Sequence, residues 1–183
     1  MDKLNEQAIL RELLALDLIC IEEDVKVSIA LFGGASLILH LGDNQFRGTR
    51  DIDYRTEYVS SREKFIKIQE LMPGVFEELG GFPEFPDQEL YQKNGKEYYE
   101  WDGVKFSNIK IFLPSIEMIA LSKLMSSREK DLEDLTDTPI LNICDLVKLK
   151  ELIDDCATYL ANTREYNYLE WGEILNARGL KLS

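Results

Sequence analysis

The chain has 183 residues, of which 45% are hydrophobic and 30% charged, a composition that suits one sizeable core rather than a disordered chain. Its formal net charge of −13 argues against general DNA binding, which needs lysine and arginine to neutralise phosphates. The sequence shows no apolar run near the roughly 18 residues of a membrane span and no signal-peptide pattern at its N-terminus. We therefore expect no membrane partner and a cytoplasmic protein whose three cysteines stay reduced.

The first third of the chain switches between helix and strand patterns. Apolar residues near 3.6-residue spacing predict a helix that Asn5 caps and that runs to about Leu18. Period-two alternation predicts a strand over residues 25–31, which is ended by two adjacent glycines. The pattern then predicts a short buried helix over residues 35–41 and a second strand over residues 51–55.

The middle of the chain continues this mixture. A serine-capped helix is expected to begin at Ser60 or Ser61, to be interrupted at Pro73-Gly74 and to add one last helical turn after it. Asn94-Gly95 predicts the turn of a hairpin, and residues 104–113 predict one further strand.

The last part of the chain is helical in pattern. Residues 115–135 predict one continuous helix, and Thr138-Pro139 predicts the start of the next, which contains Cys144. Strands thus dominate the first part of the chain and helices the last. We expect an α+β fold with a core over residues 1–113 and a helical C-terminal part over residues 114–183 that packs on it.

Two carboxylates stand two residues apart on the second predicted strand. Side chains at such spacing project from one strand face, so Asp51 and Asp53 can share a divalent cation. Mg²⁺ suits such a pair because it takes one or two protein carboxylates together with substrate phosphates. Taken alone, however, the pair is more typical of solvated side chains than of a metal site.

The segments beside this pair carry complementary groups. Gly33-Gly34 stands between a strand and a short helix, where bare backbone amides and a helix N-terminus can bind phosphate oxygens, although a plain tight turn is the commoner use. Arg47 and Thr49 place a cation and a hydroxyl just before the carboxylates. A metal pair, a phosphate cradle and a cation are the parts that phosphoryl or nucleotidyl transfer requires.

Two blocks of the sequence resemble a known superfamily. The stretch GGASLILHLGDNQFRGTRDID resembles the signature of the DNA-polymerase-beta-like nucleotidyltransferases, and its Arg-x-Thr-x-Asp-Ile-Asp form is most similar to AbiEii-like toxin nucleotidyltransferases and their uncharacterised bacterial relatives. The later stretch IKIFLPSIEMIALSKLMSSREKDLEDL resembles that family's second block, a strand, a proline and a lysine-bearing helix. The resemblance implies a small nucleotidyltransferase-type mixed sheet flanked by helices.

The resemblance also implies roles for particular residues. It assigns Mg²⁺ to Asp51 and Asp53, and it assigns the phosphates of an NTP to Gly33, Gly34, Arg47, Thr49, Lys123 and Arg128. Asp131 or Asp134 would complete the catalytic set, as a third carboxylate or as the orienting partner of Lys123. Without the resemblance, Lys123 is slightly better explained as a lysine at the rim of a core face that extends its ammonium into solvent.

The implied activity is Mg²⁺-dependent transfer of a nucleoside monophosphate from an NTP to an acceptor hydroxyl. The AbiEii resemblance implies the 3′ end of a tRNA as acceptor and a cognate antitoxin as partner. The superfamily also carries a third metal-binding carboxylate on a later strand, for which Glu100 and Asp102 are the candidates here, neither in an apolar strand setting. His40, the single histidine, is expected to pack rather than to catalyse.

Two alternatives stay open at this point. One is a small-molecule nucleotidyltransferase of the lincosamide or aminoglycoside kind, whose cationic substrates suit an acidic protein. The other is an inactive nucleotide-binding or partner-binding module, which the unclear third carboxylate favours.

Overall fold

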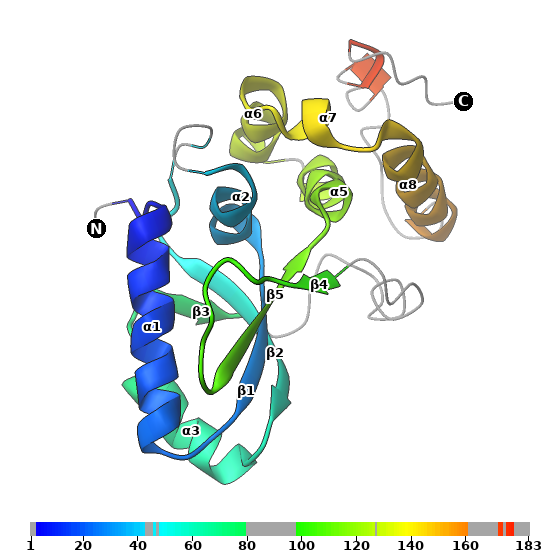
Figure 1. Ribbon diagram of the computed structural model, residues 1–183. Coiled ribbons are helices and arrows are strands. Elements are labelled where there is room, and N and C mark those ends of the chain that lie inside the picture. Colours follow the sequence, from blue (N-terminus) through cyan, green and yellow to red (C-terminus); the bar gives the residue numbers. More distant parts are fainter. Residues whose placement is uncertain are drawn as a thin grey trace. The chain divides into compact units, whose positions relative to one another are not determined.

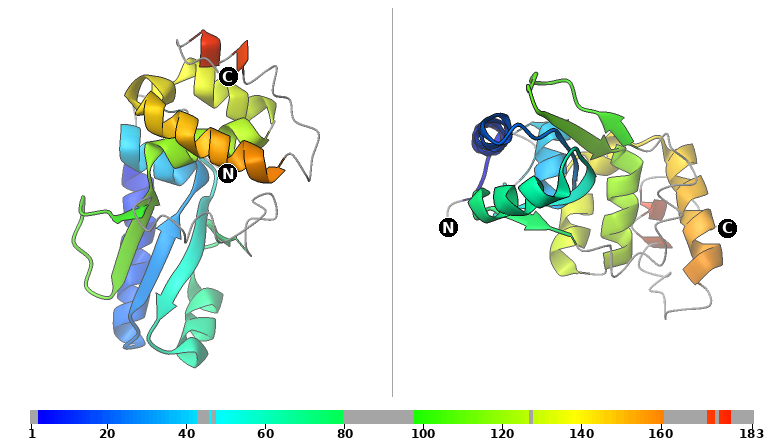
Figure 2. Two further views of the ribbon diagram at one scale, coloured as in Figure 1. Left: turned by 90° about the vertical axis from the view of Figure 1, so that its right-hand side faces the viewer. Right: turned by 90° about the horizontal axis from the view of Figure 1, so that it is seen from below.

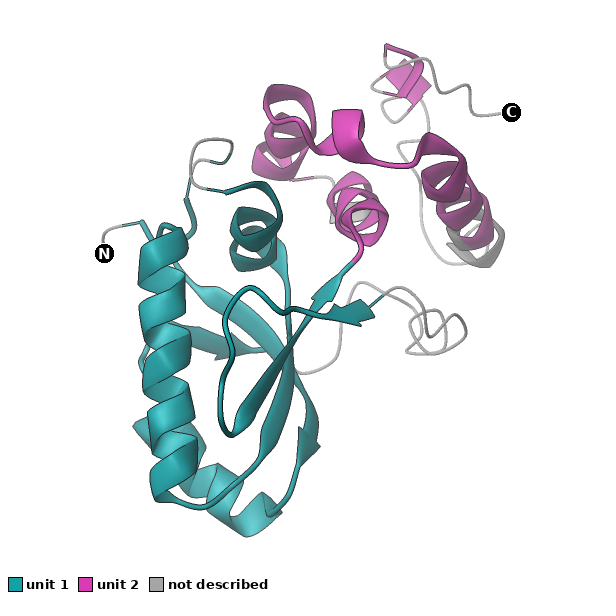
Figure 3. Ribbon diagram, in the orientation of Figure 1, with its two compact units in different colours: residues 1–81, 93–114 teal, residues 82–92, 115–183 magenta. Residues whose placement is uncertain are grey.

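A computed structural model describes residues 3–42, 46, 48–79, 98–126, 128–160, 172–173 and 175–177. The chain divides into two compact units, Met1–Gly81 with Lys93–Pro114 and Phe82–Gln92 with Ser115–Ser183 (Figure 3). In the described ranges, no helix combines the length and the apolar character that crossing a lipid bilayer requires.

The first unit is built on a mixed sheet, which has five strands within the described residues. They are β1 (Val27–Leu31), β2 (Ile52–Val59), β3 (Phe76–Glu78), β4 (Tyr98–Glu100) and β5 (Ile109–Pro114), in the spatial order β3-β2-β1-β5-β4 (Figure 1). Strand β1 is antiparallel to β2 and parallel to β5, while β3 is parallel to β2 and β4 antiparallel to β5. Strand β1, the run before the two glycines, is the central strand of this order, and all its residues are buried.

Three helices flank this sheet in the described part of the first unit. They are α1 (Glu6–Glu22), α2 (Gly33–Leu41) and α3 (Arg62–Leu71). Helix α1 begins where the Asn5 side chain accepts the N–H of Ala8 at 2.9 Å, and it buries Ile9, Leu13 and Leu16 in the core. Helices α1 and α3 contact each other beside the strands (Figure 2). The mixed sheet with its flanking helices confirms the expected α+β fold.

A buried carboxylate of α1 holds the loop before β5. Asp17 accepts the backbone N–H of Asn108 at 2.7 Å and of Ile109 at 3.0 Å on Oδ1, and that of Ser107 at 2.9 Å on Oδ2. These three bonds tie the end of the loop to the helix. The strand predicted over residues 104–113 is therefore too long at its start, because β5 begins only at Ile109.

Removing this carboxylate is expected to destabilise the first unit strongly. In Asp17→Ala, three backbone N–H groups lose an ionised acceptor in a buried site, which should lower the free energy of unfolding by about 3 kcal/mol. Asp17→Asn keeps one oxygen acceptor and should lower the free energy of unfolding by less. Urea unfolding followed by circular dichroism measures both. Glu151→Ala, at an exposed helix position, is the control. A loss below about 1 kcal/mol in Asp17→Ala would contradict this role.

Strands β3 and β4 lie where the sequence predicts a helical turn and a hairpin. Residues 76–78 form strand β3 rather than a last helical turn, because their backbone pairs with β2 over Ile52, Asp53 and Tyr54. Within the expected hairpin, Tyr98–Glu100 forms β4 and pairs with β5. The turn at Asn94-Gly95 lies outside the described residues.

The second unit is helical in its described part. It contains α5 (Ile116–Ser126), α6 (Glu129–Asp137), α7 (Ile140–Ile143) and α8 (Leu146–Leu160), and α5 contacts the other three. The continuous helix predicted over residues 115–135 is wrong, because Arg128 is extended (φ −80°, ψ 134°) and α6 starts after it. The next predicted helix also divides, at Cys144 (φ −63°, ψ 141°), into α7 and α8.

The described cysteine side chains are buried and reduced. Burial raises the pKa of Cys20 to about 12, with a further contribution from the charge of Asp17. Burial likewise raises the pKa of Cys144 to about 12, to which the charges of Glu117 and Asp145 add. Both thiols stay protonated at neutral pH and are poor nucleophiles. The side chain of Cys156 lies outside the described residues.

Candidate functional site

The Gly-Gly turn joins the end of β1 directly to the N-terminus of α2. Phe32 occupies the N-cap position, and its side chain makes no capping hydrogen bond. The first amides of α2 therefore have no acceptor within the helix. Such amides, together with the positive end of the helix dipole, form a seat for an anion such as a phosphate.

The carboxylate of Asp53 lies against this turn. A Cβ atom placed on Gly33 would stand 2.6 Å from Asp53 Oδ2, and Gly33 also has a left-handed φ of 55°. The Phe32 N–H donates to the carbonyl of Asp53 at 2.9 Å, which fixes the start of β2 beside the turn. Only glycine permits both the backbone conformation and the close approach. The two halves of the motif thus lie against each other.

Thr49 connects the second glycine with the first carboxylate. A Cβ atom on Gly34 would stand 2.6 Å from Thr49 Oγ1, and this hydroxyl donates to Asp51 Oδ1 at 3.2 Å. The backbone of Thr49 is held by Leu4, through N–H···O bonds of 2.6 and 3.2 Å. The buried Thr49 hydroxyl therefore orients Asp51 in this structure.

One carboxylate beside this site was missed by sequence reasoning. Glu77 on β3 is the register partner of Asp53 on the parallel strand β2. Register partners on neighbouring strands lie about 4.8 Å apart and project from the same sheet face. The sequence holds one signal for this strand. After Pro73-Gly74, two glutamates stand between Phe76 and Leu79, in a segment whose length is typical of a short strand.

The side chains of the candidate site suit a magnesium ion that binds together with a nucleotide. Among the residues that the structure describes, no three His, Cys, Asp or Glu side chains form a group that could hold a metal by themselves. Asp51 and Asp53 offer two carboxylates beside the anion seat of α2, and Mg²⁺ completes such a donor set with phosphate oxygens and water. The donor chemistry therefore matches a metal that binds together with a triphosphate.

The second unit gathers the remaining predicted residues into an ion cluster. Lys123 Nζ lies 3.0 Å from Asp131 Oδ1 and 2.6 Å from Asp134 Oδ2, and Arg128 Nε lies 2.5 Å from Asp131 Oδ2. Lys123 and both carboxylates are buried. The break at Arg128 allows this, because α6 folds back onto α5. The cluster fits the expected orientation of Lys123 by Asp131 or Asp134, and the binding of a nucleotide by these residues stays a prediction. Arg47 lies outside the described residues.

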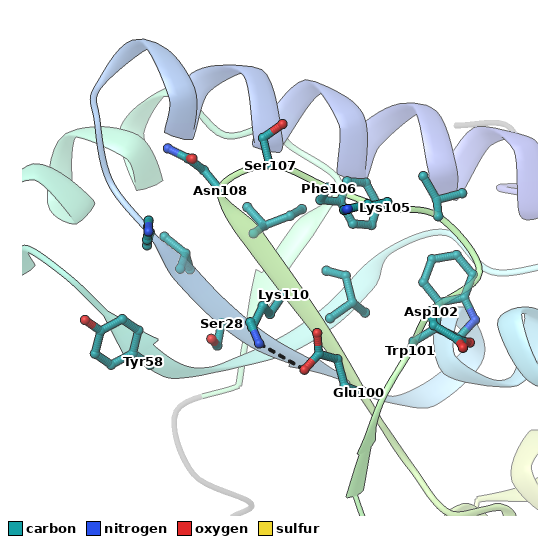
Figure 4. A pocket seen from close by; sticks show the side chains of 15 residues that line it. Ser28, Tyr58, Glu100, Trp101, Asp102, Lys105, Phe106, Ser107, Asn108 and Lys110 are labelled. Carbon is teal, nitrogen blue, oxygen red and sulfur yellow. Dashed lines mark hydrogen bonds and ion pairs between the residues drawn. The ribbon is translucent and has the colours of Figure 1, made fainter.

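A cavity of about 620 Å³ lies at the opposite end of β1 from the glycine turn (Figure 4). It is lined by Ser28, Tyr58 and the loop that follows β4, and an ion pair of 3.0 Å joins Glu100 to Lys110 at its edge. Glu100 and Asp102, the two earlier candidates for the third carboxylate, both line this cavity. Strands β1 and β5 separate β4 from β2, a distance of about 14 Å across the sheet, so Glu100 does not join Asp53.

His40 makes structural contacts within the first unit. Its Nε2 lies 2.9 Å from the carbonyl oxygen of Pro114, and its Nδ1 lies 3.0 Å from the Tyr99 hydroxyl. The Tyr99 ring also packs edge-on against the imidazole. These contacts agree with the packing role expected for this histidine.

Comparisons with known proteins bear on the family and the fold of this chain. Residues 9–177 match the family described as nucleotidyltransferase of unknown function (DUF6036). A solved structure, that of an antigenic nucleotidyltransferase-like protein from Paracoccidioides brasiliensis, matches with a TM-score of 0.50 and 15% identity over 100% of this chain and 97% of that one. No match is found among curated proteins.

The family match and the structural match test the expected fold and family. At 15% identity the structural match shows the fold alone, and it confirms the nucleotidyltransferase-type sheet. The AbiEii-like subtype stays a prediction. Because the family match extends over residues 9–177, the chain belongs to this family of nucleotidyltransferases of unknown function.

Proposed function

We propose that the chain transfers a nucleoside monophosphate from an NTP to an acceptor hydroxyl in a Mg²⁺-dependent reaction. The observation that carries the proposal is the close approach of the Gly33-Gly34 turn to Asp53, beside Thr49 and Asp51. Family membership and fold support nucleotidyl transfer in general. An anion seat next to paired carboxylates is the arrangement that a metal-bound triphosphate requires.

The residues of the first unit divide the work between phosphate and metal. The first amides of α2 bind phosphate oxygens, while the absence of side chains at Gly33 and Gly34 lets Asp53 and Thr49 approach the turn. Asp51 and Asp53 hold Mg²⁺, with Thr49 orienting Asp51. When bound, Mg²⁺ neutralises charge on the triphosphate and on the pyrophosphate that leaves. Arg47 is proposed to steady the phosphates. The nucleotide contacts expected of Lys123 and Arg128 stay predictions.

The transfer step requires a group that takes up a proton. The acceptor oxygen forms a bond to the α-phosphorus while the bond from that phosphorus to the bridging oxygen breaks, and pyrophosphate leaves. The hydroxyl proton is lost in the same step. Glu77 is proposed to accept it, because it is exposed and stands beside Asp53 on the neighbouring strand.

Two acceptor classes follow from different observations. The resemblance to AbiEii-like toxins supports the 3′ end of a tRNA, with a cognate antitoxin as partner. The net charge of −13 favours a cationic small molecule instead, because an acidic protein attracts it and repels RNA phosphates. We place tRNA first, since the motif resemblance concerns the site itself.

Labelled nucleotides decide between these possibilities. The full chain is incubated with each α-³²P-labelled NTP and Mg²⁺, with total tRNA in one arm and with a mixture of aminoglycosides and lincosamides in the other. Label on tRNA that EDTA prevents is the expected result. Label on a small molecule instead would replace the tRNA proposal with the second class. Mg²⁺-dependent NTP binding with no transfer in either arm would overturn the enzymatic proposal and identify a nucleotide-binding module.

A further inference from the structure

Helix α1 carries a second apolar stripe that is exposed. The stripe at Ile9, Leu13 and Leu16 is buried in the core. A different stripe consists of Leu14, Leu18 and Ile21, which are 45%, 60% and 43% exposed, and continues to the partly exposed Leu10. Residues three and four apart lie on one helix face, so Leu10, Leu14, Leu18 and Ile21 form a continuous line, here called the α1 seam.

The charges beside the α1 seam have opposite signs at its two ends. Arg11, whose side chain is 73% exposed, stands near the N-terminal end. Glu22 and Glu23 stand at the C-terminal end. Arg11 and Glu22 are eleven residues apart, close to three full turns, so both flank the seam on the same side. The ion pair of Arg11 with Glu12 spans 3.4 Å between residues next to each other in sequence and competes little with another partner.

We propose that the α1 seam is the interface of a homodimer in which the two α1 helices pair in antiparallel orientation. A twofold axis between Leu14 and Leu18 places Leu14 against Leu18 of the partner subunit and Leu10 near Ile21 of the partner subunit. The same axis brings Arg11 to Glu22 of the partner subunit, twice in each dimer. Such an interface is closed and self-complementary, as a twofold dimer requires.

Charge selects this orientation over the parallel one. In a parallel twofold pair, the flank that carries Arg11 and Glu22 would lie on opposite sides of the interface in the two subunits, so neither residue would meet an opposite charge of the partner subunit. Antiparallel pairing brings the two flanks together, so that Arg11 of each subunit meets Glu22 of the other, and it also sets the two helix dipoles in opposite directions, which is favourable. The inference does not depend on the proposed function, because none of these residues belongs to the candidate site.

Sedimentation velocity on the full chain between 1 and 100 µM tests the dimer. The wild type is expected to sediment at twice the chain mass of 21.1 kDa, and Leu18→Glu at the chain mass. Val147→Glu, at a side chain that is 70% exposed on α8, is the matched control and should leave the dimer intact. A wild type that is monomeric at 100 µM, or a control as disruptive as Leu18→Glu, would overturn the proposal.

A charge exchange tests the orientation separately. Arg11→Glu and Glu22→Arg are each expected to raise the dimer Kd at least tenfold in low salt, and the double variant should return it to near the wild-type value. Circular dichroism spectra that match that of the wild type would show that the folds are intact. Failure of the double variant to recover would contradict the antiparallel pairing.

Discussion

Replacing Asp51 or Asp53 by asparagine is expected to lower the rate of nucleotidyl transfer at least a hundredfold and to leave the fold intact. Asparagine keeps the size of the side chain but removes the charge that is proposed to hold Mg²⁺ next to the glycine turn. Losing this electrostatic stabilisation should cost at least about 3 kcal/mol in the transition state. Folding should survive, because removing one of two neighbouring negative charges is neutral or mildly stabilising without metal.

Three measurements separate catalysis from folding in these variants. Each variant should melt at or slightly above the wild-type temperature in EDTA, lose the upward shift that Mg²⁺ with NTP produces, and transfer no label. Glu70→Gln, at an exposed position of α3, is the control and should behave as the wild type. Unfolding of both variants would assign the pair a structural role. Retained transfer in both would move the metal to other carboxylates, of which Glu77 is the first to test.

Replacing Lys123 by alanine is expected to lower the free energy of unfolding by about 3 to 5 kcal/mol. Its ammonium bridges Asp131 and Asp134, and the three side chains are 6%, 5% and 2% exposed. Without the lysine, two carboxylates stay in a buried site with Arg128 contacting Asp131. Breaking a buried ion network by removing one partner leaves charge uncompensated, which is costlier than replacing the whole network.

A neutral replacement tests that reason directly. The triple variant Lys123→Met, Asp131→Asn, Asp134→Asn removes all three charges and should recover most of the stability that Lys123→Ala loses in urea unfolding. Lys150→Ala, which removes an exposed ion pair with Asp154, should lose less than about 1 kcal/mol. A loss of that small size in Lys123→Ala would mean that the cluster contributes nothing to folding.

The sequence by itself determined which segments of the first unit belong together. The glycine turn, the hydroxyl of Thr49 and the two carboxylates lie within a stretch of 21 residues that begins with helix α2 and ends in strand β2. Such features depend on neighbouring residues, because a glycine turn and the two-residue period of a strand are set locally. The structure brings Gly33, Gly34, Thr49, Asp51 and Asp53 together, and their roles in transfer stay predictions.

Only the tertiary structure decided the features that depend on contacts between distant segments. Glu77 lies beside Asp53 because β3 adds to the edge of β2, and a three-residue strand has too few residues for a period to be recognised. The segment before β5 stays a loop because Asp17, about ninety residues earlier in the sequence, accepts hydrogen bonds from its backbone amides. The helix predicted through Arg128 breaks there, and the break lets α6 bring two carboxylates to Lys123. In each case pairing or burial outweighs the local propensity, which contributes less than 1 kcal/mol per residue.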